Sequence, residues 1–294
     1  MRGAGCSRSF PGAILLRRRR TKPGSRSATK ADVTVRFLDP HVHASASPCS
    51  VLGDRELCAW FDTHPQFLPC VSDHMTWEFY ETDWAVARVY RGDILFGTEI
   101  TLGGVYDFVL LTHDLSAFTE LGHSGSGKGI ASPAGSGPGS LDGQLRLFAD
   151  PRVLVTFAHP PLWSARRGTS WRDWLRQIPV DFLEYNAIRL LPSSFSLRRS
   201  NGRGSSGELD PGLLDDNEQL LELRDSLFPH ARFIVGSDSH QPDRLGTTYV
   251  EFDSPVVGGR DAWDRLRRGA FRGRLDLDGL GSFRIDPDSG LAIS

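Results

Sequence analysis

Short apolar segments alternate with longer segments of helical periodicity over most of this 294-residue chain. The apolar segments are rich in β-branched and aromatic residues, which is typical of strands. They cover residues 33–38, 67–71, 94–97, 106–111, 153–158, 180–185 and 232–236. Between them the sequence predicts helices at 54–61, 78–90, 141–148, 171–177 and 213–227. Seven strands alternating with helices predict an α/β fold with a parallel sheet, as one barrel or as a doubly wound sheet.

The length suits either two ordinary domains or one large α/β barrel. Residues 122–140 and 192–212 are rich in Gly, Ser and Pro, and we interpret them as loops within a domain rather than as linkers. We therefore expect a single domain over residues 32–294. No apolar run approaches the roughly 18 residues of a membrane span, so we expect no membrane partner.

The first 31 residues differ from the rest in charge. They contain nine Lys or Arg and no acidic residue, whereas the whole chain carries a net charge of -2. Such a segment is compatible with an organellar transit peptide, a nucleic-acid-binding arm or an extension upstream of the true start. We favour a disordered extension outside the fold. The four cysteines form no CxxC pair and no disulfide framework, which favours a reducing, cytoplasmic setting.

Every predicted strand ends in a His or a carboxylate. In α/β folds the carboxyl ends of parallel strands converge on one face, where chemistry takes place. The residues expected there are His41, His43, His74, His113, His159, His240, Asp73, Glu99 and Asp238. The HxH and DxH spacings place both side chains of each pair on one side of an extended chain.

This set of side chains indicates a metal centre. Mixed imidazole and carboxylate ligands suit Zn, Mn or Fe, whereas Ca and Mg prefer oxygen alone. The set exceeds the four ligands of one tetrahedral zinc ion, so we expect two or three divalent ions. Paired ions stabilise the attacking and leaving oxygens of a phosphoryl displacement.

The motifs resemble those of the PHP family, the polymerase-and-histidinol-phosphatase metallohydrolases, over residues 39–246. The family's DxHxH with a following Ser is matched by Asp39, His41, His43 and Ser47; its TDH by Ser72, Asp73 and His74; its GxE by Gly97 and Glu99; its single His by His113; its AHP by 158–160; and its GSDxH by 236–240. SPC at 47–49 and EYN at 184–186 are similar to the smaller stand-alone bacterial phosphoesterases of the family.

The resemblance implies a distorted seven-stranded β/α (TIM-like) barrel with a two- or three-metal centre at its mouth. It implies that His41, His43 and Asp238 hold one ion, that Glu99 bridges to a second ion held by His113 and His159, and that His74 and His240 serve a third ion or the phosphate. Asp73 then orients a His or ligates directly. Cys49 stands where trinuclear members supply a His. A thiolate there would be a soft ligand favouring Zn, whereas a buried neutral Cys would pack, and we favour packing.

The expected function is that of a metal-dependent phosphoesterase, a hydrolase of phosphoric ester bonds acting on a small phosphomonoester or nucleotide. A water molecule activated by the metals attacks phosphorus, with Glu99 holding the ions and His240 or His74 protonating the leaving alkoxide. Arg166, Arg167 and Arg189 are candidates for clamping the phosphate. Two alternatives remain: a histidinol-phosphate phosphatase, and a non-catalytic metal-binding PHP scaffold associated with nucleic acid through the basic tail.

Overall fold

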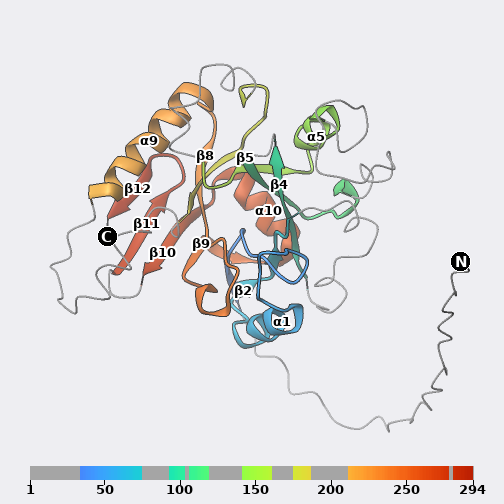
Figure 1. The fold of residues 1–294 in the computed structure, drawn as a ribbon. Helices are drawn as coiled ribbons and strands as arrows, with labels where there is room; N and C mark the ends of the chain where they lie inside the picture. Colours follow the sequence, from blue (N-terminus) through green and yellow to red (C-terminus); the bar gives the residue numbers. More distant parts are fainter. Residues whose placement is uncertain are drawn as a thin grey trace, which may run out of the picture. The chain divides into compact units, whose positions relative to one another are not determined.

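Two six-stranded sheets organise the part of the chain that the structure, a computed structural model, describes (Figure 1). The described residues are 34–74, 93–102, 106–118, 141–160, 175–186, 211–277 and 281–293. The first sheet has the order β12-β11-β10-β9-β1-β2 and the second the order β3-β4-β5-β6-β7-β8. All of these strands belong to one compact unit, Val33–Ser294.

The second sheet contains six of the expected strand segments. Its strands are β3 (Cys70–Val71), β4 (Leu95–Leu102), β5 (Tyr106–Thr112), β6 (Leu154–Phe157), β7 (Phe182–Asn186) and β8 (Arg232–Gly236). The expected parallel arrangement is wrong at one place, because β5 runs antiparallel to both β4 and β6. The other neighbouring pairs, β3 with β4, β6 with β7 and β7 with β8, are parallel.

The first sheet was only partly predicted. It consists of β1 (Val35–Leu38), β2 (Phe67–Leu68), β9 (Thr248–Val256), β10 (Phe271–Leu277), β11 (Gly281–Asp286) and β12 (Gly290–Ile293). The last four strands form an antiparallel meander that continues from β1. Pro69 separates β2 from β3, and since proline has no N–H it interrupts the single strand expected at 67–71.

The expected closed seven-stranded barrel does not form among the described strands; the second sheet is curled and its edges meet on residues 41–43. The Ser72 N–H, just past β3, donates to the Val42 carbonyl at 2.8 Å. The His43 N–H donates to the carbonyl of Ser239, just past β8, at 2.9 Å. Residues 41–43 do not continue β1 as a regular strand because Pro40 ends it, and β1 itself pairs with β2 and β9.

Four helices cover the sheets in the described residues. They are α1 (Asp54–Thr63), α5 (Leu141–Phe148), α9 (Pro211–Leu227) and α10 (Gly258–Arg268). The first three match expected helices, whereas α10 was not expected. It packs against β4 and β9 and ends at Gly269, whose φ of 72° is the left-handed conformation of a helix C-cap (Figure 1).

Several expected features lie outside the described residues. These are the extension at 1–31, the helix at 78–90, most of the helix at 171–177, the loop at 122–140 and nearly all of the loop at 192–212.

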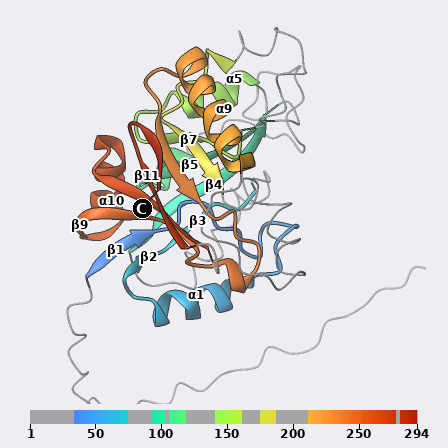
Figure 2. The same ribbon diagram turned by 90° about the vertical axis from the view of Figure 1, so that its left-hand side faces the viewer.

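Two hydrophobic cores lie within this unit. The larger contains the fully buried rings of Phe108, Phe157 and Phe233. The smaller lies under α1, which Figure 2 shows beside β2, and joins Leu57 of the helix to Val42. No helix of the described residues is both long and apolar enough to cross a membrane.

Candidate metal centre

Residues 41–43 present two imidazoles on one side of the chain. Val42 is 1% exposed and belongs to the core under α1. Because side chains alternate along an extended segment, His41 and His43 both point away from that core. Their Nε2 atoms lie 3.1 Å apart. Two nitrogens that each bind one zinc ion at about 2.1 Å can lie no more than ~4.2 Å apart, so this spacing allows a shared ion.

Glu99 of β4 lies between two sets of imidazoles. Its Oε1 atom is 3.1 Å from His159 Nε2. Its Oε2 atom is 3.0 Å from His74 Nδ1 and 3.3 Å from His43 Nε2. Oε2 is buried, yet it makes no hydrogen bond with the described residues in spite of these distances. These nitrogens approach a buried carboxylate oxygen but do not have hydrogen-bond geometry toward it. Ligands of one shared cation would be arranged in the same way.

Asp238 completes this arrangement from the end of β8. Its Oδ1 atom lies 3.2 Å from His43 Nε2 and 3.5 Å from His41 Nε2, and its Oδ2 atom lies 4.0 Å from His159 Nε2. Asp238 has a φ of 51° and His159 a φ of 28°, both in the left-handed region that residues other than glycine rarely adopt. Strained backbone at two candidate ligands is typical of a functional site.

Four overlapping groups of side chains have ligand atoms within 4.8 Å of one another. They are His43, His74 and His240; His41, His159 and Asp238; His41, His43 and Glu99; and Glu99, Asp107 and His159. Mixed nitrogen and oxygen donors of this kind suit Zn, Mn or Fe. The donor set therefore fits divalent metal ions.

The electrostatics of the cluster favour added positive charge. Burial lowers the pKa of His41, but the carboxylates of Glu184 and Asp238 outweigh burial and raise it well above its usual value. Burial lowers the pKa of the neighbouring His43 to about 4. Burial raises the pKa of Glu99, but contacts with His159 and His41 outweigh it and lower that pKa far below its usual value. A divalent cation would supply the charge that the proton on His41 otherwise provides.

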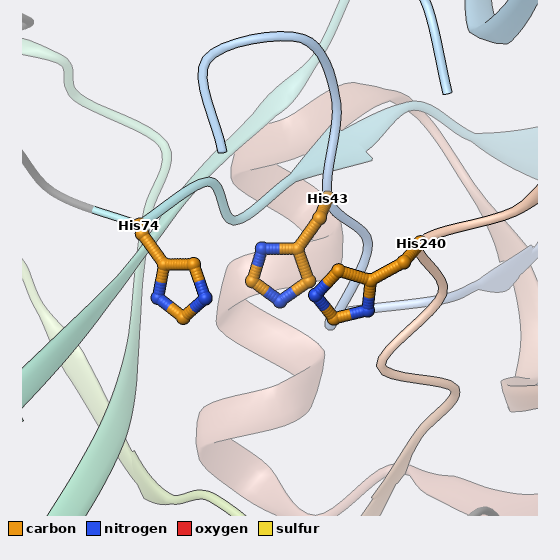
Figure 3. A group of neighbouring side chains, drawn as sticks. All are labelled: His43, His74 and His240. Carbon is orange, nitrogen blue, oxygen red and sulfur yellow. The ribbon is translucent and has the colours of Figure 1, made fainter. Parts of the chain in front are cut away.

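Two imidazoles of the cluster reach the exposed side. Figure 3 shows His43 between His74 and His240, with the three rings side by side on three different segments. The side chains of His74 and His240 are 32% and 26% exposed, whereas that of His43 is fully buried. Any substrate would therefore meet His74 and His240 first.

Cys49 lies at this exposed side and is not packed in the interior, so the interpretation of a buried, packing Cys is wrong. Its Sγ atom is 3.0 Å from His240 Nε2. The Nδ1 atom of His240 faces the carbonyl oxygen of Asp238 at 2.8 Å, so the ring is fixed from both ends. Burial and the nearby carboxylates of Glu99 and Asp238 raise the pKa of the Cys49 thiol, which favours the neutral form in the absence of a cation.

The structure does not bring His113 into any of the four groups; Asp107 occupies the corresponding place. Asp107 is the second residue of β5 and His113 directly follows the strand. Because β5 runs antiparallel to β4, Asp107 pairs with Thr101 near the carboxyl end of β4, whereas His113 lies at the opposite edge. The His113 ring stands edge-on to Trp263 of α10, with ring centroids 5.2 Å apart. Asp107 Oδ2 is 3.7 Å from His159 Nδ1.

Asp73 supports the site by holding the chain beside it. Its Oδ1 atom accepts hydrogen bonds from the Ala44 N–H at 2.6 Å and from the Ser47 hydroxyl at 2.7 Å. Because that hydroxyl proton is used, Ser47 Oγ accepts from His43 Nδ1 at 2.9 Å. The lone pair of neutral His43 is thereby left on Nε2, which faces the cluster.

Two carboxylates near the cluster were not singled out from the sequence. Asp107 is the second residue of β5, a strand that follows the pair Gly103–Gly104, which is a hairpin signal. Glu184 lies in the EYN segment at the end of β7. The candidate phosphate clamps Arg166, Arg167 and Arg189 lie outside the described residues.

No family model matches the chain, and no curated protein sequence matches it. Solved structures to which the chain is similar include PsfC from Pseudomonas syringae, at 16% identity and a TM-score of 0.46, covering 79% of this chain and 93% of that one. The lesion-specific endonuclease PfuEndoQ from Pyrococcus furiosus has 14% identity and a TM-score of 0.47, covering 79% of this chain and 56% of that one. A two-domain protein from Bacteroides vulgatus has 12% identity and a TM-score of 0.46, covering 86% of this chain and 70% of that one. The last contains a predicted PHP-like metal-dependent phosphoesterase.

Proposed function

We propose that this chain is a metal-dependent phosphoesterase that hydrolyses a small phosphomonoester or nucleotide. The observation that carries the proposal is the place of Glu99, a buried carboxylate whose two oxygens face separate imidazoles, His159 on one side and His43 and His74 on the other. A carboxylate in this position could hold two ions, one at each oxygen. The PHP resemblance of the motifs supports the same chemistry, and with it a barrel-type fold.

Metal ions bound by these residues would lower the pKa of a water molecule and neutralise the phosphoryl oxygens. The chain's own groups then divide into two sets. His41, His43, Glu99, His159 and Asp238 are buried and would hold the ions.

His74 and His240, which are partly exposed, face the phosphoryl group directly or through a third ion. Either imidazole is placed to give a proton to the leaving alkoxide, since imidazole is the commonest general acid of enzyme sites. A small phosphorylated substrate is the expected partner, in the cytoplasm.

The test joins metal content to turnover. Protein purified without chelator is subjected to elemental analysis and assayed for phosphate release from nucleotides, sugar phosphates and histidinol phosphate. We expect two or more equivalents of Zn, Mn or Fe in the wild type, and a loss of turnover of at least ~100-fold in Glu99→Ala, because the bridging ligand is gone. Glu251→Gln is the matched control, since Glu251 pairs with Arg274 on the first sheet. A metal-free wild type, or full turnover in Glu99→Ala, contradicts the proposal.

A further inference from the structure

Glu184 of β7 belongs to none of the four ligand groups but contacts two of their members. It is 1% exposed. Its Oε1 atom lies 2.7 Å from His41 Nδ1, and its Oε2 atom accepts a hydrogen bond from the backbone N–H of His159 at 2.9 Å. One buried carboxylate thus connects a ligand that follows β1 with a ligand that follows β6.

The contact with His41 determines which nitrogen of the ring is available. An ionised carboxylate only accepts hydrogen bonds, so His41 Nδ1 must donate to Glu184. When His41 is neutral, its lone pair is then on Nε2, the atom that faces His43 and Asp238. A hydrogen bond from the far nitrogen to a carboxylate both fixes the ring and makes the near nitrogen a stronger donor to a metal.

The contact with His159 fixes the backbone of the second ligand. His159 has a φ of 28°, a conformation that costs of order 1–3 kcal/mol unless its surroundings hold it. The hydrogen bond from the backbone N–H of His159 to Glu184 Oε2 helps to hold the residue in this strained conformation. The same residue places its ring nitrogen 3.1 Å from Glu99 Oε1. Glu184 therefore helps to aim His159 at the bridging carboxylate.

The neighbouring strand leaves room for this arrangement. A Cβ atom on Gly236, at the end of β8, would collide with Glu184 Oε1 and with the Cβ atom of His41. The absence of a side chain at Gly236 lets the carboxylate reach the imidazole.

We infer that Glu184 is a positioning residue that aligns His41 and His159 together and so couples the two ions of the centre. The inference rests on the proposed function for the presence of the ions. If the inference is right, losing the Glu184 carboxylate weakens the binding of both ions, although Glu184 itself is not a ligand.

The test uses Glu184→Gln in the full-length protein, with zinc affinity measured by competition against a chromophoric chelator. An amide of the same shape has one acceptor oxygen where the carboxylate has two, so it cannot accept from both His41 Nδ1 and the His159 N–H. If its NH2 group faces His41, the ring must accept on Nδ1 and carry its proton on Nε2, the nitrogen that would bind metal. We expect zinc affinity to fall by about 10–100-fold, the usual effect of losing such a supporting group. The visible absorption of the Co²⁺-loaded variant should change in intensity, because it reports ligand geometry. Excess zinc should restore part of the phosphate release.

The matched control is Asp181→Asn. Asp181 precedes the same strand and also accepts a backbone hydrogen bond from the β6 region, from the Val155 N–H at 2.8 Å. Its variant should keep wild-type zinc affinity. Circular dichroism of the metal-free proteins establishes that each variant folds. Glu184→Ala, which removes both acceptors, is a second variant with the same expected loss of zinc affinity. If Glu184→Ala does not fold, the zinc affinity of Glu184→Gln alone decides whether the inference holds.

Wild-type zinc affinity in Glu184→Gln, or an equal loss in Asp181→Asn, overturns the inference and leaves the proposed function intact. A wild type that binds no zinc and releases no phosphate overturns the proposed function itself.

Discussion

Each of three imidazoles in the cluster is held by an acceptor that is not a ligand. His41 is held by Glu184, His43 by Ser47 and His240 by the carbonyl oxygen of Asp238. The sequence predicted the imidazoles because strand ends mark them. It did not predict Glu184 as a partner of His41, because 143 residues separate the two and only folding brings them together.

Replacing Ser47 by Ala should weaken both the fold and the site. Its hydroxyl oxygen accepts from His43 Nδ1 and from the His74 N–H, and it donates to Asp73. Leaving buried donors unpaired costs about 1–3 kcal/mol, so we expect that loss in the unfolding free energy of the metal-free protein, measured in urea. Ser45→Ala, in the same loop but exposed and bonded only to Asp54 among the described contacts, should change it by less than ~0.5 kcal/mol. Equal effects in both variants would contradict the assignment.

A methyl group at Gly236 should disrupt the centre from the opposite side. Gly236→Ala pushes against Glu184 and His41, and overpacking of this kind costs about 1–3 kcal/mol. Zinc affinity should fall with it, as measured by chelator competition. Gly53→Ala is the control, because no atom lies within 4 Å of the added Cβ. Unchanged zinc binding in Gly236→Ala would show that the carboxylate is free to move.

At the scale of elements, the strands of the second sheet were predicted well and their directions less well. β8 agrees residue for residue with the predicted 232–236. The reversal of β5 was missed, although only three residues separate it from β4 and a parallel crossover needs a dozen or more. The reversal of β5 relative to β6 was beyond prediction, since about forty residues connect them. The alternating residues of β10 also signal a strand that was overlooked.

The direction of β5 yields a test that separates its two ends. Asp107→Asn should lower the affinity for one of the two ions by roughly tenfold, because Asp107 lies with Glu99 and His159. His113→Ala should keep the wild-type metal content, because its ring packs against Trp263. Elemental analysis and zinc competition measure both variants. Loss of an ion in His113→Ala alone would contradict the observed strand direction.

At the scale of the whole unit, the candidate metal centre joins residues that lie within or just after strands of both sheets. His41 follows β1 of the first sheet, while Glu99, His159 and Asp238 come from the second. The carboxylates of Glu99 and Asp238 are both buried, and each has an oxygen within 3.3 Å of His43 Nε2. Metal binding should therefore contribute to folding stability as well as to chemistry.

Removal of metal should lower the melting temperature. Zinc at one hundred times its dissociation constant stabilises a protein by ~2.7 kcal/mol, equivalent to about 5–10 °C for a unit of this size. Differential scanning calorimetry with and without chelator measures the shift. In Glu99→Ala the shift should shrink, since the bridge is missing. A melting temperature of the wild type that is indifferent to chelator would mean that metal binding and folding are independent.

The position of residues 41–43 also sets the order in which the molecule can be completed. The Ser237 hydroxyl donates to the His41 carbonyl across 196 residues of sequence. His41 therefore cannot take its place beside Asp238 until β8 has been added to the chain. Contacts of such long range must be closed against chain entropy and form late in folding. A ribosome-bound chain that ends before β8 therefore holds His41 and His43 without Asp238. The complete centre, and with it any hydrolytic activity, can arise only after β8 and the Asp238 that follows it have been synthesised.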